Sequence, residues 1–480
     1  MNQDDARLSD VLLVLIASMV ALVLVSREAD PDIFGRIAYA RDAYAQGAWT
    51  WHADPYSYTV PGGPWLDHEW GFSWIAFFTF KLGGWWAIRL LRLLLMAGTG
   101  WLCLTAVPRG PASRRLAPGL ALVLAPVLAL AFIGPRPQAL SYLCFAWMLS
   151  CFVRSWDQGP RWMLWAVVPM PLWVNVHGGF LAGLGVAVLW TLCRLPELLR
   201  RRDRAHLMWA AAVVAWCGMS LLMQPWGWNY ALRIAQSATM ARPFVEEWNP
   251  PPFLGVHWVL SMVLVVIAAT AVRFGWRRWP DLAVVSVLIV QTALHRRHLT
   301  FLAIAVALFA YPALAAHWTK RRSSAWANRA FTRTATAVVG LGALLVLGKV
   351  AAKMRGPMPH EPDWPAAALT FLRTQEGGGV LVDFEWAQYV IFTASPQFKV
   401  AADGRYEEVY PDSVMRQYVA WHFGFDGWSS LPDNPNTRFA LVATNSTRAT
   451  RLASLNATWK SLYADSTATV FAKLAQKPTP

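Results

Sequence analysis

Long apolar runs recur along most of this chain, and they limit its fold more than any other feature. Eleven runs approach or exceed the length needed to cross a hydrocarbon core of about 30 Å. They are residues 10–26, 86–107, 116–134, 138–154, 162–176, 179–199, 207–224, 255–273, 279–294, 299–318 and 334–352. Since 56% of the 480 residues are hydrophobic and only 15% are charged, the chain is too apolar for a soluble protein of this size. We predict a polytopic α-helical membrane protein with about 11 transmembrane helices.

Basic residues gather in short clusters between alternate apolar runs. The clusters are Arg109, Arg114 and Arg115; Arg154 and Arg161; Arg194, Arg200, Arg201, Arg202 and Arg204; Arg273, Arg277 and Arg278; and Lys320, Arg321, Arg322, Arg329 and Arg333. Loops rich in Lys and Arg remain in the cytoplasm, so these clusters predict a cytoplasmic N-terminus and an extracytoplasmic C-terminal part. The same clustering explains the net charge of +15 by membrane topology and argues against nucleic acid as a partner.

One apolar stretch, residues 71–82, does not fit this alternation. A span needs about 20 residues, and counting this shorter stretch as one would reverse the side of every later loop. We interpret it as a re-entrant or interfacial helix that starts at Trp70.

The C-terminal part has a different composition. A proline-rich linker leads into short apolar runs at 380–384, 398–403 and 439–444, which alternate with helix-like segments and end in a closing pair at 459–465 and 468–474. This alternation predicts a soluble α/β domain over 356–480 with a largely parallel sheet. It follows a transmembrane domain over 1–355, whose long external loop covers 27–82 and includes interfacial helices. No glycine-rich phosphate loop follows any of the strands. The five cysteines all lie in apolar runs, so they predict neither a disulfide framework nor a zinc site.

The loop after the first apolar run combines acidic and aromatic side chains. Its ionisable residues are Asp30, Asp32, Asp42, Asp54, Asp67, His68 and Glu69. Unpaired carboxylates are costly in lipid, so we expect a protein that places several beside a helical bundle to use at least one of them. The alternative is an interfacial amphipathic helix whose acids simply face water.

The order of this loop resembles the C-type (GT-C) glycosyltransferases, which include protein O-mannosyltransferases, aminoarabinose transferases and the catalytic subunit of oligosaccharyltransferase. In their pattern a catalytic aspartate heads the loop helix. Counting back from Ala40-Arg41 and Gly47-x-Trp49 leads to Asp32, while Asp30 misses the spacing by two.

Further pieces of the chain resemble bacterial membrane proteins of this superfamily whose substrates are mostly undefined. The pieces are DPYSYT (54–59), HEW (68–70), RPQ (136–138), NVHGG (175–179) and DGRYEEVYP (403–411). The resemblance spans nearly the whole chain and implies a multi-pass protein of the bacterial inner (plasma) membrane.

The resemblance implies transfer of a sugar from a polyprenyl-phosphate or polyprenyl-diphosphate carrier to a glycan, lipid or protein acceptor outside the cytoplasm. Asp32 suits the general base, with Asp30 as the second candidate, because a partly dry carboxylate can have its pKa raised toward that role. The leaving phosphate needs cationic or hydrogen-bonding partners. Our candidates for substrate and carrier-phosphate binding are Arg296, Arg297, His295, His298, Arg136, His68, Glu69 and His177. The alternative for the His295–His298 run is that its side chains reach to the lipid headgroups.

In the resembled superfamily, oligosaccharyltransferase-like members use a divalent metal together with a second acidic motif in the next external loop. This chain has no DxD or ExD motif there, so the departure implies no required metal, although His68, Glu69 and His177 could still bind a divalent ion. In the C-terminal domain, Asp403 and Arg405 are candidates for acceptor binding, with a structural ion pair as the alternative. Two other functions remain open at this point. One is a flippase or transporter of lipid-linked sugars, and the other is a noncatalytic scaffold with the same fold.

Overall fold

A computed structural model describes residues 30–104, 127–132, 134–237, 246–314 and 364–474, together with Leu120 and Leu124. The chain divides into two compact units, and the second combines Arg27–Ala87 with Arg355–Pro480. The described residues 30–82, which we assigned to the external loop of the transmembrane domain, thus belong to the same unit as the C-terminal part.

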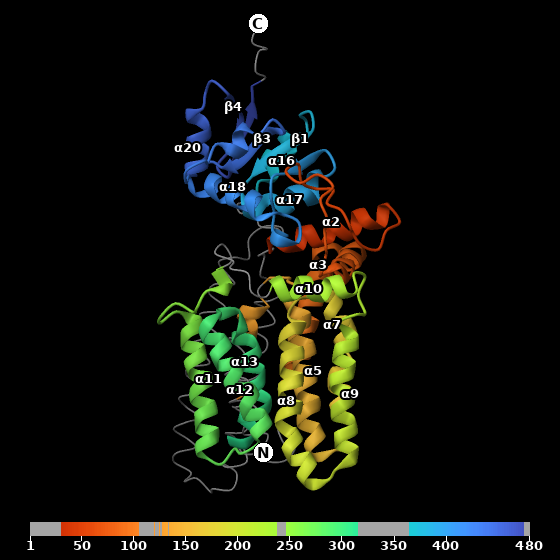
Figure 1. Cartoon of the computed structure of the whole chain (residues 1–480). Coiled ribbons are helices and arrows are strands. Elements are labelled where there is room, and N and C mark those ends of the chain that lie inside the picture. Colours follow the sequence, from red (N-terminus) through yellow and green to blue (C-terminus); the bar gives the residue numbers. More distant parts are fainter. Residues whose placement is uncertain are drawn as a thin grey trace. The chain divides into compact units, whose positions relative to one another are not determined.

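The first unit is helical (Figure 1). Its described helices include α5 (Gln138–Asp157), α6 (Arg161–Val167), α7 (Met170–Val176), α8 (Phe180–Arg201), α9 (Arg204–Ser220), α10 (Trp228–Ser237), α11 (Val256–Arg273), α12 (Trp279–Leu294) and α13 (Leu299–Ala305). Two 3-10 helices, η1 (Glu246–Trp248) and η2 (Arg296–His298), and a π-helix, η3 (Val306–Ala310), lie among them. Helix α8 packs against α9 and α12, and α5 packs against α6 and α13. Apolar side chains of these helices, such as Phe145 on α5, Trp190 on α8 and Val284 on α12, are buried.

Five helices of the described residues are long and apolar enough to cross a membrane. They are Trp70–Leu104, Gln138–Asp157, Phe180–Arg201, Val256–Arg273 and Arg296–Leu314, and Trp279–Leu294 is a shorter apolar helix. The expected spans at 138–154, 179–199, 255–273 and 299–318 correspond to four of the five. The expected runs 10–26 and 334–352, and most of 116–134, lie outside the described residues.

The stretch 71–82 begins a helix at Trp70, as expected. It forms the first part of α3 (Trp70–Leu104), whose second part is the next expected span. Gly83 and Gly84 interrupt the helical geometry between the two parts, and Gly84 adopts φ 57° and ψ −144°, a conformation that residues with a Cβ rarely adopt. The short run and its neighbour are therefore two helices that meet at a kink.

The second unit contains a five-stranded sheet. Its elements are α2 (Pro31–Ala45), α16 (Ala366–Leu372), β1 (Gly378–Val382), α17 (Phe384–Ala394), β2 (Phe398–Val400), η5 (Tyr406–Glu408), α18 (Asp412–Phe423), α19 (Ser430–Asp433), β3 (Thr437–Ala443), α20 (Thr447–Ser454), β4 (Trp459–Ala464) and β5 (Ala468–Lys473). The strand order is β2-β1-β3-β5-β4. Strand β1 runs parallel to β2 and β3, whereas β5 is antiparallel to β3 and β4. The expected closing hairpin is present, and because it adds two antiparallel pairings the sheet is mixed rather than largely parallel.

The N-terminal segment of this unit joins the same sheet and the same core. Ser57 forms a parallel bridge with Val400, and the Val400 N–H donates to the Tyr56 carbonyl oxygen at 2.9 Å. Helix α2 packs on α17, where the ring of Phe34 lies 4.8 Å from that of Tyr389 and 5.6 Å from that of Phe392. Residues from the two ends of the chain thus share one hydrophobic core.

Candidate active site

Helix α2 places the two candidate aspartates in different roles. Asp30 is its N-cap, and its Oδ1 accepts a hydrogen bond from the Asp32 N–H at 3.1 Å, while Pro31 occupies the first helical position. Asp32 lies in the first turn and is half-buried. The partial positive charge at a helix N-terminus favours an ionised carboxylate there. Asp30 therefore forms the start of the helix on which Asp32 is presented.

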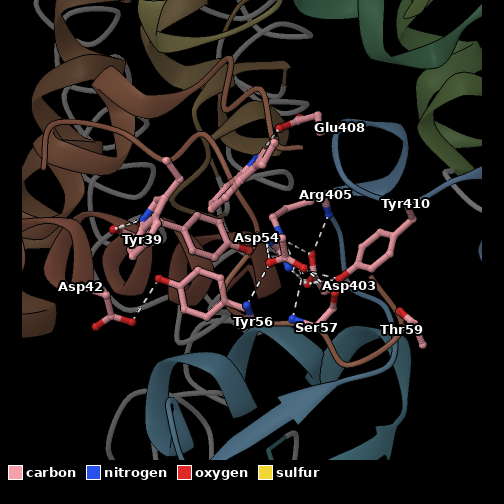
Figure 2. A network of polar contacts seen from close by, with 12 residues as sticks. Tyr39, Asp42, Asp54, Tyr56, Ser57, Thr59, Asp403, Arg405, Glu408 and Tyr410 are labelled. Atoms are coloured by element: carbon pink, nitrogen blue, oxygen red, sulfur yellow. Dashed lines mark hydrogen bonds and ion pairs between the residues drawn. The ribbon is translucent and has the colours of Figure 1, made fainter. Parts of the chain in front are cut away.

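A second buried cluster surrounds Arg36, one turn after Asp32. The Arg36 guanidinium bonds Asp67 Oδ1 at 2.7 Å and Glu69 Oε2 at 2.6 Å. His68 continues the cluster, with its Nδ1 2.6 Å from Glu408 Oε1 and its Nε2 3.5 Å from Glu69 Oε1. Glu408 also accepts from the indole of Trp65 at 3.3 Å (Figure 2). The candidates His68 and Glu69 are thus engaged in internal ion pairs.

Burial and the neighbouring charges shift the pKa values of this cluster in opposite directions. Burial raises the pKa of Asp67 to about 6 even though Arg36 opposes the shift. Burial alone lowers the pKa of His68, but Glu408 and Glu69 outweigh it and raise that pKa to about 9. His68 is therefore an imidazolium at neutral pH and balances part of the carboxylate charge.

Arg405 is enclosed by carboxylates and aromatic rings (Figure 2). Its guanidinium bonds Asp54 Oδ1 at 2.7 Å and Asp403 Oδ2 at 2.6 Å, and Tyr410 Oη donates to Asp403 Oδ2 at 2.7 Å. The centroids of the Tyr39, Tyr56, Trp65 and Tyr410 rings lie 4.6–5.8 Å from the guanidinium carbon. Burial alone raises the pKa of Asp403, but Arg405 and the hydrogen bonds hold it below its usual range.

The burial of this pair bears on its expected role in acceptor binding. Asp403 and Arg405 are 0% and 1% exposed, and Arg405 has a carboxylate partner on each side. An acceptor could reach either side chain only by breaking those pairs. The geometry therefore favours the structural alternative, in which the pair connects the 54–58 loop to the C-terminal sheet.

In the first unit, four predicted phosphate-binding residues contact η1 or the residue that follows it. Arg136 Nη1 bonds Glu247 Oε2 at 2.8 Å, and the Arg297 guanidinium carbon lies 4.4 Å from the centre of the Trp248 ring. His295 Nδ1 lies 2.5 Å from the Trp248 carbonyl oxygen. The Arg296 N–H donates to the Asn249 carbonyl oxygen at 3.0 Å, which ties η2 to the segment after η1.

The two remaining histidine candidates differ in their surroundings. His298 packs edge-on against the His295 ring at 5.9 Å, and both of its ring nitrogens are buried without a hydrogen-bond partner. His177 is 4% exposed, and its Nδ1 accepts from the Gly179 N–H at 2.9 Å while lying 2.7 Å from Ser141 Oγ. A ring nitrogen that accepts a backbone N–H carries no proton, so the proton of a neutral His177 is on Nε2.

Several residues of these clusters were missed by the sequence analysis. Gln388 Nε2 donates to Asp32 Oδ1 at 3.1 Å across 356 positions of sequence, and no local pattern marks such a partner. Arg36 carried a usable signal, because it stands one helical turn from Asp32 in a segment rich in acids. In the part of the chain that the structure describes, no group of three or more His, Cys, Asp or Glu side chains is arranged to hold a metal ion.

No protein-family model matches the sequence, and no curated protein matches it either. Solved structures do match. The apo oligosaccharyltransferase of Archaeoglobus fulgidus aligns with a TM-score of 0.60 at 11% identity, covering 91% of this chain and 69% of that one. Apo ArnT from Cupriavidus metallidurans aligns with a TM-score of 0.57 at 16% identity, covering 98% and 99%.

A third similar structure is the arabinofuranosyltransferase AftD from Mycobacteria, with a TM-score of 0.55 at 16% identity. The alignment covers 97% of this chain and 40% of AftD. All three are C-type glycosyltransferases, so the fold expected from the resemblance is confirmed. The chain has the fold of the C-type (GT-C) glycosyltransferases.

Proposed function

We propose that this chain is an integral-membrane glycosyltransferase that moves a sugar from a polyprenyl-phosphate or polyprenyl-diphosphate carrier to an extracytoplasmic acceptor. One observation carries the proposal: in a chain with the C-type glycosyltransferase fold, Asp32 occupies the first turn of the loop helix, half-buried and hydrogen-bonded to Gln388. That is the position and environment that a general base needs.

The reaction assigns a role to each group. Asp32 takes the proton of an acceptor hydroxyl, whose oxygen then bonds to the anomeric carbon of the sugar. The bond between that carbon and the carrier phosphate oxygen breaks, and the phosphate leaves with the electron pair. For the charge that develops on the phosphate, we assign Arg136, Arg296 and Arg297, since cationic donors stabilise such a group strongly away from water.

The test uses the lipid-linked sugar fraction extracted from the cells that make this protein. The purified protein is incubated with that fraction in detergent, and mass spectrometry follows the conversion of polyprenyl-phosphate sugars to free polyprenyl phosphate. We expect the wild type to release carrier and Asp32→Asn to lose this activity while keeping its fold. Asp42→Asn, at the other end of α2, is the matched control and should remain active.

Other outcomes decide between the rival functions. Release of carrier that continues in Asp32→Asn would refute the assigned base. A wild type that consumes no donor, but moves intact lipid-linked sugar across proteoliposomes, would identify a flippase. A wild type that neither consumes donor nor moves lipid-linked sugar would overturn the proposal and favour the noncatalytic scaffold.

We also propose that the protein lies in the bacterial inner membrane with its C-terminal domain outside the cytoplasm. The arginine-bearing loops support this orientation. A cysteine introduced at Ser429 should react with a membrane-impermeant maleimide in intact spheroplasts, whereas the wild type, whose five cysteines lie in apolar segments, gives the background. Labelling that requires cell lysis would reverse the orientation.

We propose further that turnover needs no divalent metal, because His68 and Glu69 are already paired with Glu408 and Arg36. Dialysis against EDTA should leave release of the carrier unchanged. A loss of activity that added Mg²⁺ or Mn²⁺ restores would show a metal requirement.

A further inference from the structure

Helix α17 of the C-terminal domain brings an amide group to Asp32. Gln388 lies in the middle of this helix and is 2% exposed. Its Nε2 donates to Asp32 Oδ1 at 3.1 Å. The orientation of the amide is the favourable one, since the reverse orientation would place the carbonyl oxygen against the carboxylate.

The Gln388 amide occupies space that is open only because residues 35 and 404 are glycines without a Cβ. A Cβ on Gly404 would stand 2.5 Å from Gln388 Nε2 and 3.0 Å from Asp32 Oδ1, and a Cβ on Gly35 would stand 2.3 Å from Gln388 Oε1. Any side chain at either position would displace the amide from Asp32. The backbone of α2 and of the loop between β2 and η5 therefore packs closely around the Gln388 side chain.

The amide is poorly suited to a purely structural role. Gln388 Oε1 is buried without a hydrogen-bond partner, and so is the Tyr39 hydroxyl, which lies 2.8 Å from the same Cβ position on Gly35. Buried polar atoms without partners destabilise a fold. A leucine or methionine would fill this space without that penalty. The hydrogen bond to Asp32 is the interaction that an apolar residue could not supply.

We propose that Gln388 is a positioning residue for Asp32, and this inference rests on the proposed role of Asp32 as the general base. The amide donor holds the carboxylate in one orientation and favours its ionised form, which is the form that accepts a proton. The C-terminal domain then contributes to the chemical step through α17, beyond the acceptor binding expected from sequence.

The first test measures the Asp32 carboxyl directly and needs no substrate. A hydrophobic carbodiimide adds to protonated carboxyl groups, and mass spectrometry of the tryptic peptide 28–36 separates labelling of Asp32 from that of Asp30. Since the amide favours the ionised form, Gln388→Leu should raise the labelling rate of Asp32 at neutral pH by about 3- to 10-fold. Gln388→Glu should raise it further through repulsion between like charges. Labelling of Asp30 should remain constant.

Gln397→Leu is the matched control, because Gln397 lies in the same domain and donates only to the carbonyl oxygens of Arg373 and Gln375. It should leave Asp32 labelling at the wild-type rate. Gln388→Leu should also keep or raise the thermal midpoint, because it removes an unpartnered buried oxygen. Equal Asp32 labelling in the wild type, Gln388→Leu and Gln397→Leu would overturn the proposal.

The second test compares carrier release. A misplaced base should slow turnover in Gln388→Leu by about 10- to 100-fold, with Gln397→Leu unaffected. Full turnover in Gln388→Leu, in a preparation where Asp32→Asn is inactive, would overturn the role of Gln388 and leave the proposed function standing. Turnover that survives in Asp32→Asn would instead refute the proposed function, and the role of Gln388 with it.

Discussion

Two groups of arginines in this protein have opposite environments. Arg36 and Arg405 in the second unit are 5% and 1% exposed, and each is paired with two carboxylates at 2.6–2.7 Å. In the first unit, the Arg136 side chain is 41% exposed and pairs with one carboxylate, Glu247 Oε2, at 2.8 Å, and Arg297 lies over the ring of Trp248. A buried guanidinium between two carboxylates must break both ion pairs to bind anything else. The contrast supports a structural role for Arg36 and Arg405, whereas the arginines around η1 remain our candidates for binding the carrier phosphate.

The largest effect should follow from Arg405→Ala. Removing this cation leaves Asp54 and Asp403 buried without their partner, which we expect to destabilise the protein by about 3–5 kcal/mol. Thermal unfolding in detergent would measure the loss. Arg416→Ala is the control, because Arg416 and its partner Asp412 are largely exposed and such pairs contribute about 0–1 kcal/mol. A stable Arg405→Ala variant with a weakened affinity for the acceptor would restore the acceptor-binding role.

The arginines of η2 should show the opposite behaviour. Replacing Arg296 and Arg297 with Gln should lower carrier release by a factor of at least about 100, since one donor to a developing negative charge contributes about 2.7–4 kcal/mol. The thermal midpoint should change little. The double replacement of the exposed residues Arg200 and Arg201 at the end of α8 provides a matched control. Near-normal turnover in the η2 variant would contradict the phosphate-binding role and favour the alternative, in which these side chains reach to the lipid headgroups.

The ion pairs of His68 should make the stability of the fold depend on pH. Because Glu408 and Glu69 raise its pKa to about 9, His68 stabilises the fold fully below about pH 6.5, and this contribution is lost as the pH rises through 9. We expect the wild type to lose roughly 1–3 kcal/mol of stability across that range. Thermal midpoints at pH 6.5, 8 and 9.5 would show the decline. The decline should be much smaller in His68→Gln, and equal slopes in both proteins would contradict the assignment.

The smallest effect is expected at the surface. Arg438 Nη2 lies 2.9 Å from Glu376 Oε2, but these side chains are 51% and 85% exposed. Arg438→Ala should therefore change the thermal midpoint hardly at all, consistent with about 0–1 kcal/mol for exposed pairs. A loss comparable to that of Arg405→Ala would show that burial does not separate the two groups of arginines.

The sequence predicted those parts of the fold that depend on residues close together in the chain. The start of a helix at Trp70 was predicted because the chain changes there from polar to apolar, and the closing hairpin followed from its alternating residues. The helix that follows directly after Gly83 and Gly84 was not predicted to adjoin the first, although the interruption at these glycines agrees with the low helix propensity of glycine. The mixed sheet was missed because strand direction depends on pairing between distant segments.

The candidate site also contains residues that the sequence could identify and residues that it could not. The spacing that selected Asp32 over Asp30 stays a prediction, and the structure adds that Asp30 is the cap of α2 and Asp32 lies in its first turn. The partners of Asp32 and Arg405 could not be predicted, because Gln388 and Asp54 lie more than 300 positions away from them. Only folding brings these residues together.

The ion pair between Asp54 and Arg405 has a consequence for synthesis of the chain. Its members are 351 positions apart, so Asp54 emerges from the ribosome long before its partner. The membrane-spanning helices between them must enter the membrane while Asp54 still lacks Arg405. Contacts between such distant residues also form slowly. The ion pair is therefore completed only when translation has passed residue 405, and a chain that stops before residue 388 carries Asp32 without its amide partner.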